Sequence, residues 1–430
     1  MRMKISEKWL IPFFILIAVF RYPPNLLDAN LFAEDGIVFL SDYNSSGITS
    51  FNNSFNGYPI FGLYFLTALA SWIHAITGLA GYTLPTFISL TSFIYWGLFA
   101  YSPIYFFKGV IARANSIVLG FAILLMPLGT SDAVILGTIG NLKFSFLPLS
   151  FFVAARLASK EKITKREFSL NGVLLVICIL TNPLSILSLL VLIQKLIKSI
   201  SCRDWFQILW FTVFIAFAGY PVLGQLSNSY KISGYLDAPF QYDKTIEIFA
   251  GQTILYAPFH AIYTQLNDFV ALIIALLLVL FVLSQSKRMN YLPFVALAMA
   301  VIGSTIFVFQ RPGVSEFFSG YTLTAPSQFF YSQNVLVVTA LFLAIEGFKQ
   351  QKFRIEIKRL RLFLALTIFA SQVFPTTPIG SFGKDAPMQS QVSSAIESAS
   401  EVCSGKSLEV NVPIYPTGTL IFITNREFWC

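Results

Sequence analysis

The chain has 430 residues, of which 56% are hydrophobic and 12% are charged, and a formal net charge of +8. Soluble domains carry about 25% charged residues, and several apolar runs here reach the ~20 residues that a helix needs to cross a bilayer. The composition therefore indicates a polytopic membrane protein. We interpret the positive charge as a mark of cytoplasmic loops rather than of nucleic-acid binding, because the sequence has no glycine-rich phosphate loop, no Cys/His metal cluster and only two histidines.

The apolar runs predict the helices in chain order. The first run, residues 9–24, follows a basic N-terminus, and no small-residue cleavage site follows it, so we expect a helix that is retained. The other runs are 59–80, 84–107, 113–129, 143–158, 172–197, 206–224, 269–286, 291–310, 330–348 and 360–374. Basic clusters lie between many of these runs, and their expected cytoplasmic position orients the chain.

Two runs do not fit a strict in-and-out path. If residues 59–80 crossed the membrane, the basic loop at 108–113 would lie outside, so we expect this segment along the outer interface, or dipping in and returning. Residues 172–197 have basic loops on both sides. Pro183 ends or kinks a helix at the middle of this run. We expect a short re-entrant hairpin with legs of roughly 12 residues; a single long kinked helix is the alternative.

These adjustments predict an all-α membrane domain over residues 1–374, with about nine spans, a cytoplasmic N-terminus and external loops at 25–58 and 225–268. The tail, residues 375–430, is expected outside. Its sequence predicts a short helix and then short strands that are broken by Pro413, Pro416 and Gly418.

The tail contains two of the four cysteines, Cys403 and Cys430. A disulfide between them is compatible with an oxidising compartment. Two unpaired thiols are the alternative, because spacing along the chain does not fix the distance between two sulfur atoms.

The first external loop contains an acidic pair, Glu34 and Asp35, between apolar residues in "LFAEDGIVFL". Carboxylates near a region of low dielectric are costly unless they are paired or functional. The pair either caps the turn that follows it or supplies chemistry at the outer membrane surface, and the sequence pattern alone leaves both readings open.

The segment "FAEDGIVF" resembles the first-loop motif of the GT-C glycosyltransferases, which are integral-membrane enzymes that use polyprenyl-phosphate sugars. The segment "LLMPLGTSDAVILGTIGNLKF" resembles their second external loop, and "LTNPLS" resembles their hairpin tip, although Asn182 stands where relatives have Lys. In length, number of spans, re-entrant segment and external tail, the chain is most similar to the serotype-converting O-antigen glucosyltransferases of enteric bacteria and their phages.

This resemblance implies an enzyme of the bacterial inner membrane that works on the periplasmic face. It implies transfer of a hexose, with glucose the first expectation, from undecaprenyl phosphate to a lipid-linked O-antigen glycan. The implied partners are this donor, this acceptor, membrane lipids and a flippase that supplies the donor. An O-antigen polymerase or ligase, and a lipid-linked sugar flippase or transporter, are the alternatives.

The resemblance also assigns roles to the acidic pair. Asp35 is expected as the general base and Glu34 as a second carboxylate, which orients the acceptor or binds an ion. Carboxylates of this kind are donors for Mg²⁺, and Mn²⁺ is the other candidate, so metal dependence stays open and no cofactor is assigned. A direct displacement would invert the anomeric centre, whereas a nucleophilic carboxylate would retain it; the resemblance favours inversion.

Few cations are expected on the outer side to bind the lipid phosphate. Arg311 in "FVFQRPG" is one candidate, because a guanidinium can bind phosphate oxygens as a fork, and Lys143 in "GNLKF" is the other. Both residues could instead be anchors at the headgroups. Candidates for the acceptor sugar are Asp132, Asn141 and His260, with a cap or a purely structural role as the alternative for each.

Overall fold

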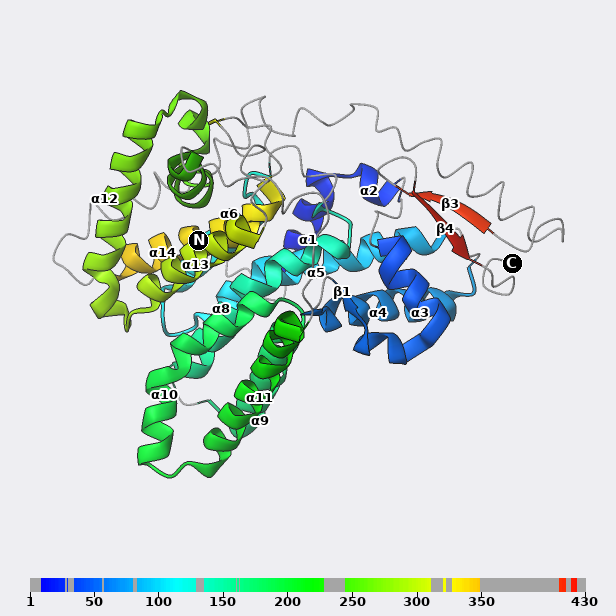
Figure 1. Cartoon of the computed structure of the whole chain (residues 1–430), viewed down its shortest axis with the longest axis horizontal. Helices are drawn as coiled ribbons and strands as arrows, with labels where there is room; N and C mark the ends of the chain where they lie inside the picture. The colour runs from blue at the N-terminus through cyan, green and yellow to red at the C-terminus, as the bar shows by residue number, and fades with distance from the viewer. Residues whose placement is uncertain are drawn as a thin grey trace, which may run out of the picture.

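The structure of the protein is a computed structural model. It describes residues 9–27, 29, 35–55, 58–79, 83–128, 135–159, 161, 163–227, 244–310, 320–321, 327–348, 410–414 and 419–423. Within these residues the regular elements are helices, apart from the short strands β1 (Ser54–Phe55), β2 (Tyr58–Pro59), β3 (Val410–Ile414) and β4 (Thr419–Ile423). The chain is therefore mostly helical, as its composition predicts (Figure 1).

Most predicted apolar runs correspond to a helix. These helices are α1 (Leu10–Arg21), α4 (Phe61–Thr77), α5 (Leu84–Phe106), α6 (Arg113–Leu124), α8 (Lys143–Ala158), α9 (Lys165–Ile179), α10 (Leu189–Ser201), α11 (Trp205–Ser227), α12 (Asp268–Ser286), α13 (Leu292–Gln310) and α14 (Tyr331–Phe348). Three helical stretches are long and apolar enough to cross a membrane by length and composition: Leu84–Phe106, Pro183–Ser201 and Asp268–Met289. The run at 360–374 lies outside the described residues, and the number of spans stays a prediction.

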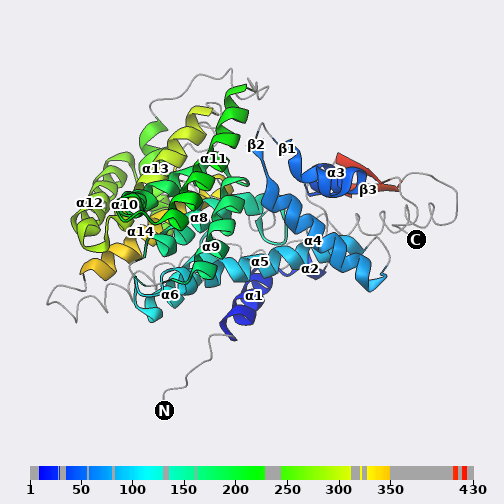
Figure 2. The same cartoon turned by 90° about the horizontal axis from the view of Figure 1, so that it is seen from below.

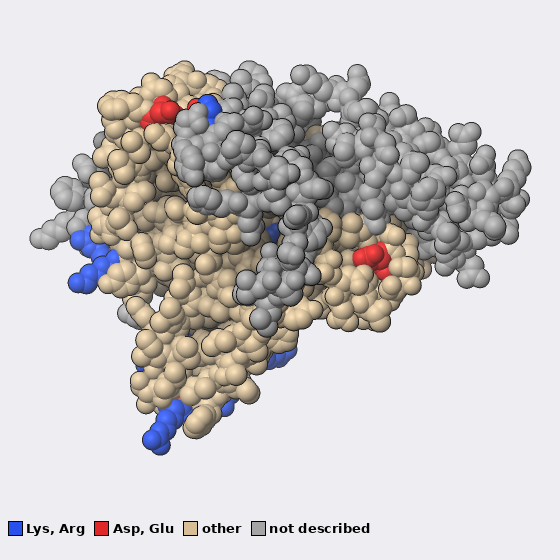
Figure 3. All heavy atoms as spheres, viewed as in Figure 1, with Lys and Arg blue, Asp and Glu red and all other residues tan. Residues whose placement is uncertain are grey.

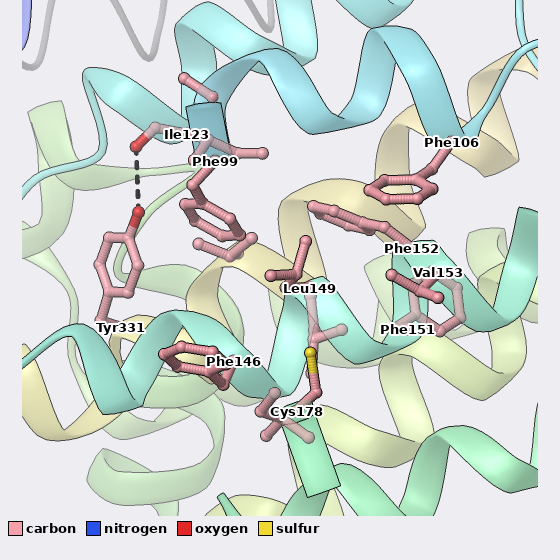
Figure 4. Packing of buried hydrophobic residues seen from close by; sticks show 14 of the residues in the cluster. Phe99, Phe106, Ile123, Phe146, Leu149, Phe151, Phe152, Val153, Cys178 and Tyr331 are labelled. Atoms are coloured by element: carbon pink, nitrogen blue, oxygen red, sulfur yellow. Dashed lines mark hydrogen bonds between the residues drawn. The ribbon is translucent and has the colours of Figure 1, made fainter. Parts of the chain in front are cut away.

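Aromatic side chains build much of the core around α5, α8 and α14. The rings of Phe99 and Phe152 stack with centroids 6.1 Å apart, and Phe107 meets Phe152 edge-on at 5.2 Å. The Tyr331 hydroxyl, at the first residue of α14, donates a hydrogen bond to the carbonyl oxygen of Ile123 at 3.3 Å (Figure 4). Edge-on and offset contacts of this kind add to the free energy gained by burying the rings.

Two glycines let helices α1, α5 and α6 approach closely. A Cβ on Gly97 of α5 would collide with Ile15 of α1, including its backbone nitrogen at 2.9 Å. A Cβ on Gly120 of α6 would collide with the carbonyl oxygen of Ala100 and lie 3.1 Å from the ring of Phe14. Small residues at helix contacts are typical of membrane bundles, because the backbones can then pack against each other.

Contacts between helix ends define two opposite ends of the bundle, and the described charged residues are divided between them. The end of α1 meets the end of α6, where Arg21 donates to the carbonyl oxygen of Leu124 at 2.6 Å. At the opposite end, the start of α6 meets the end of α14 through a hydrogen bond from Asn115 to Glu346. We call the first the loop end and the second the basic end.

Ten described cations lie at the basic end, where helices and their connecting turns meet: Lys108, Arg113, Arg156, Lys165, Arg166, Lys195, Lys198, Arg203, Lys287 and Arg288. In Figure 3 most Lys and Arg atoms lie along the left and lower margins of the described surface, one group lies at the top beside Asp and Glu atoms, and a further Asp or Glu group lies on the right. Such a distribution is what the excess of Lys and Arg in cytoplasmic loops would produce, and the orientation in a membrane stays a prediction.

The chain turns between α9 and α10 through the 3₁₀ helix η7 (Pro183–Ser188), at the predicted point. The Thr164 hydroxyl accepts a hydrogen bond from the N–H of Glu167 and caps α9, so the first leg begins seven residues before the predicted start at 172. The legs have 15 and 13 residues, more than the 12 we expected. The turn reaches the first residue of α8, where Asn182 donates to the carbonyl oxygen of Lys143 at 3.0 Å.

Helix α4, in the segment predicted to lie along the interface, packs alongside α5 (Figure 2). Its first turn meets the hairpin turn, because the N–H of Phe61 donates to the carbonyl oxygen of Leu180 at 3.1 Å. Its last turn meets the start of α5, where His74 Nε2 lies 3.1 Å from the hydroxyl of Thr83. Both ends of α4 therefore lie on the side of the loop end, and its placement at a membrane surface stays a prediction.

The described part of the tail is an antiparallel pair, β3 and β4, in which Val410 pairs with Ile423 and Ile414 with Thr419. Pro413 lies inside β3 opposite Leu420, so the prediction that Pro413 breaks a strand is wrong. A two-stranded ribbon has only edge strands, where a proline can be accommodated. Strand β4 contacts the π-helix η2 (Asp35–Leu40), which places this part of the tail beside the acidic loop.

Candidate functional site at the loop end

Asp35 begins η2 and is buried, with 1% of its surface exposed. One carboxylate oxygen accepts a hydrogen bond from the N–H of Ile139 at 3.0 Å, and the other accepts from the N–H of Gly140 at 2.5 Å. Gly140 begins the 3₁₀ helix η6 (Gly140–Leu142), which leads directly into α8. The first N–H groups of a helix have no partner inside it and attract negative charge. Asp35 therefore caps this helix from about a hundred residues away in the sequence.

The loop between α6 and α8 is fastened by side chains from the start of the chain and from α5. Asn25 donates to the carbonyl oxygen of Leu136, and Trp96 donates to that of Ile135 at 3.3 Å. Ser92 donates to the carbonyl oxygen of Thr138 at 2.8 Å. These bonds satisfy the backbone of a buried loop and hold the N–H groups that face Asp35 in one position.

Gly137 has a positive φ of 83°, and a Cβ there would lie 2.7 Å from Cβ of Asn25. The turn that presents the two N–H groups to Asp35 therefore requires glycine at this position, because L side chains rarely adopt such a φ.

Two other predicted residues lie near Asp35. Asn141 is buried and follows Gly140 directly. The ammonium group of Lys143 lies 5.6 Å from the ring centre of Phe55 and 5.4 Å from that of Phe144. The ring of Phe55 in turn meets Phe39 of η2 at 6.2 Å. The structure thus brings Asn141 and Lys143 to the first turn of the helix that Asp35 caps.

A second carboxylate of the first loop has a separate role. Asp42 Oδ2 accepts hydrogen bonds from the Tyr64 hydroxyl at 2.5 Å and from Asn53 at 2.9 Å. These contacts tie α3 (Ser41–Ser46) to α4 and to the end of η3 (Gly47–Asn52). Asp42 is therefore explained by local packing, and it provides a matched comparison for Asp35.

His260 lies in a different part of the loop end, in the 3₁₀ helix η10 (His260–Gln265). It is 3% exposed, its ring meets Tyr256 edge-on at 5.0 Å, and neither ring nitrogen has a hydrogen-bond partner among the described residues. Burial and, to a smaller extent, the positive charge of nearby Arg21 lower the pKa of His260 to about 4. A buried imidazole of this kind is neutral at pH 7.

This environment predicts a pH dependence of stability. The folded protein releases the His260 proton at about pH 4, whereas an unfolded chain releases it near pH 6.5. The contribution of neutral His260 to the free energy of unfolding is complete above about pH 6.5. It is lost as the pH falls towards 4, because the unfolded chain then binds a proton at this histidine that the folded protein does not. We expect the unfolding midpoint in detergent to fall across this window, and to fall less steeply in His260→Gln. His74→Gln, the variant at the other histidine, should keep the slope; loss of the slope there instead would contradict the assignment.

The loop predicted to be external at residues 225–268 is partly packed inside the bundle. Its π-helix η9 (Glu247–Leu255) contacts α12, α13 and α14, and the Thr253 hydroxyl lies 2.7 Å from that of Ser304. Tyr256, which lies in this loop, is fully buried, as is Tyr263. Apolar residues of η9, including Ile248 and Leu255, belong to buried hydrophobic clusters, and the side-chain amide of Gln252 has no hydrogen-bond partner among the described residues.

Several predicted site residues lie outside the described residues: Glu34, Asp132, Arg311, Cys403 and Cys430. The two described cysteines, Cys178 and Cys202, are free. No group of three or more His, Cys, Asp or Glu side chains within the described ranges could hold a metal ion.

The sequence pattern gave no site role to Asn25 and Trp96, and it counted Arg21 only among the few cations expected outside. The structure places all three residues around the same loop. Arg21 is 9% exposed at the end of α1. In the sequence, its position just after an apolar run is also that of an ordinary headgroup anchor. Only the contact with Leu124 distinguishes a residue of the loop-end site from such an anchor.

Comparison with known proteins found no matching family model, no matching curated protein and no matching solved structure.

Proposed function

We propose that this protein is a membrane glycosyltransferase that transfers a hexose from a polyprenyl phosphate to a lipid-linked glycan, with Asp35 as the general base. The observation that carries the proposal is the position of the Asp35 carboxylate, which is buried at the start of a helix and oriented by two backbone N–H groups. Backbone donors stabilise the ionised carboxylate, and a base must be ionised to accept a proton.

The chemistry requires one proton acceptor. A hydroxyl oxygen of the acceptor glycan forms a bond to the anomeric carbon, the bond from that carbon to the phosphate oxygen breaks, and its electron pair leaves with the lipid phosphate. The hydroxyl proton passes to Asp35. This direct displacement inverts the anomeric centre. The protein contributes by holding the base and the reacting groups in place.

Two described cations at the loop end suit the negative charge of the departing phosphate. Lys143 begins the helix that Asp35 caps, and Arg21 ends α1 beside Leu124. We assign the phosphate to these residues because charge-assisted hydrogen bonds to phosphate are strong, and Arg311 keeps its predicted role as a further phosphate ligand. The acceptor would enter from the side of β4, which contacts η2, and meet Asn141.

The proposal includes the finer expectations of the resemblance. We propose that the protein lies in a bacterial inner membrane with about nine spans and that its loop end faces the periplasm. The lipid carrier is then undecaprenyl phosphate, and the acceptor is an O-antigen unit. The excess of cations at the basic end supports this orientation, because such residues stay in the cytoplasm.

A reconstituted assay tests the activity itself. The full chain in proteoliposomes should move labelled glucose from polyprenyl-phosphate glucose to a lipid-linked glycan, and the product should have the inverted anomeric configuration by NMR. Other polyprenyl-phosphate hexoses should be tried in parallel. Joining of glycan units to one another would favour the polymerase or ligase, and movement of labelled lipid between leaflets without transfer would favour the flippase. Either result would contradict the proposal.

A further inference from the structure

A cavity lies at the basic end, away from the loop-end site. It has a volume of about 680 Å³ and lies between the end of α5, the turn that follows it, the start of α6 and the start of α9. Helix α5 is one of the stretches long and apolar enough to cross a membrane. A cavity at the end of such a helix would lie at the level of the lipid headgroups.

The charges that line this cavity are mostly positive. Among the described residues, its lining contains four cationic side chains and one carboxylate: Lys108, Arg113, Arg156, Arg166 and Glu167. A cavity with walls of one sign attracts ligands of the opposite sign, because the low dielectric of the protein focuses the field. The ligand of this cavity should therefore be an anion.

Glu167, the carboxylate in the described part of the lining, already binds Arg156. The guanidinium of Arg156 donates to Glu167 at 2.8 Å and to Glu161 at 2.8 Å, and also to the carbonyl oxygen of Lys108 at 3.4 Å. Its side chain is 7% exposed. Arg156 therefore fixes the cavity wall and the turn at Lys108.

Lys108 and Arg166 are exposed, and neither lies within ion-pair distance of a carboxylate on the part of the chain that the structure describes. These two cations are thus available for a ligand, whereas the charge of Arg156 is compensated within the protein.

The rim of the cavity is apolar on one side. Tyr105 is 43% exposed and Leu170 is 62% exposed, and both line the cavity. Large exposed apolar side chains beside a cationic cavity suit a molecule with a charged head and hydrocarbon chains. A free phosphate ion would leave these side chains without a partner.

We propose that this cavity binds the phosphate headgroup of an anionic phospholipid, with Lys108, Arg113 and Arg166 as ligands and the acyl chains lying over Tyr105 and Leu170. Arg156 is a positioning residue that holds the cavity wall. This inference does not depend on the proposed catalytic activity. Basic pockets between membrane helices on the cytoplasmic side commonly bind anionic headgroups.

Lipid binding to the purified full chain tests the inference. Native mass spectrometry with phosphatidylglycerol and phosphatidylcholine should show preference for the anionic lipid. The double variant Lys108→Gln/Arg166→Gln should bind phosphatidylglycerol roughly 10- to 30-fold more weakly, from about 1 kcal/mol per cation at the surface. The unfolding midpoint without lipid should confirm that the variant is folded.

Lys165→Gln is the matched control, because Lys165 is adjacent to Arg166 but lies over the ring of Phe206 at 5.6 Å and does not line the cavity. It should keep wild-type affinity. An equal loss in Lys165→Gln would show that binding follows net charge alone, and an unchanged affinity in the double variant would show that the cavity is not the site. Equally strong binding of inorganic phosphate would assign the cavity to a free anion instead of a lipid. Each of these results would overturn the proposal.

Discussion

Replacing Asp35 by asparagine should lower the rate of sugar transfer by about 10²- to 10⁴-fold, the usual contribution of a general base. Asparagine has nearly the same shape but cannot accept the proton of the attacking hydroxyl. The measurement is the initial rate in proteoliposomes, per folded molecule, with donor and acceptor in excess. Donor binding should change much less than the rate, because the proposed phosphate ligands are left in place.

The same substitution also has a structural cost, which must be measured separately. Both carboxylate oxygens of Asp35 accept backbone N–H groups, and an asparagine presents its own N–H₂ to one of these donors. Leaving a buried donor without an acceptor costs about 1–3 kcal/mol, so the unfolding midpoint should fall. Asp35→Glu keeps the charge and both acceptors on a longer side chain, and its rate should fall between those of the wild type and Asp35→Asn.

Asp42→Asn separates catalysis from loop packing. Asp42 lies in the same loop and also accepts two hydrogen bonds, from Tyr64 and Asn53, so its loss should disturb the loop without removing a base. We expect transfer within a few-fold of wild type. If Asp35→Asn transferred sugar at the wild-type rate per folded molecule, Asp35 would be a helix cap alone.

The helix positions could be predicted because apolar runs of membrane length have few other structural solutions. The run expected at 84–107 is the helix Leu84–Phe106. The predicted bounds were wrong at helix ends, because local backbone chemistry decides where a helix stops. The helix expected to continue to residue 129 ends at Leu124, shortly before Pro127, and a proline disfavours the helical conformation of the residue before it.

The candidate site was only partly predictable. The pattern around Asp35 indicated a carboxylate that either caps a turn or carries chemistry, and the structure shows that it caps a helix, but a distant one, at Ile139 and Gly140. A local sequence pattern cannot predict a contact between residues more than a hundred positions apart. The packing of η9 against the bundle was not predicted from the external loop at 225–268, since η9 has nine residues and is too short to register as a span.

The second large effect should come from Gly120 of α6, which has no side chain of its own. In Gly120→Ala the new methyl group would collide with the carbonyl oxygen of Ala100, which belongs to a helix backbone and cannot rotate away. Helices α5 and α6 must then separate, and overpacking of this kind costs about 1–3 kcal/mol. We expect a clear fall in the unfolding midpoint in detergent, even though alanine favours a helix over glycine by about 1 kcal/mol.

Gly219→Ala is the control, because a Cβ at this position of α11 meets no atom within 4 Å, so only the gain in helix propensity remains and the midpoint should rise or stay. The same comparison tests the coupling of packing to the site. Helix α6 ends at Leu124, whose carbonyl oxygen accepts from Arg21, so a displaced α6 moves this cation relative to the Asp35 loop. Transfer per folded molecule should therefore fall in Gly120→Ala and not in Gly219→Ala; an equal rate in both would mean that the position of Arg21 does not matter for the reaction.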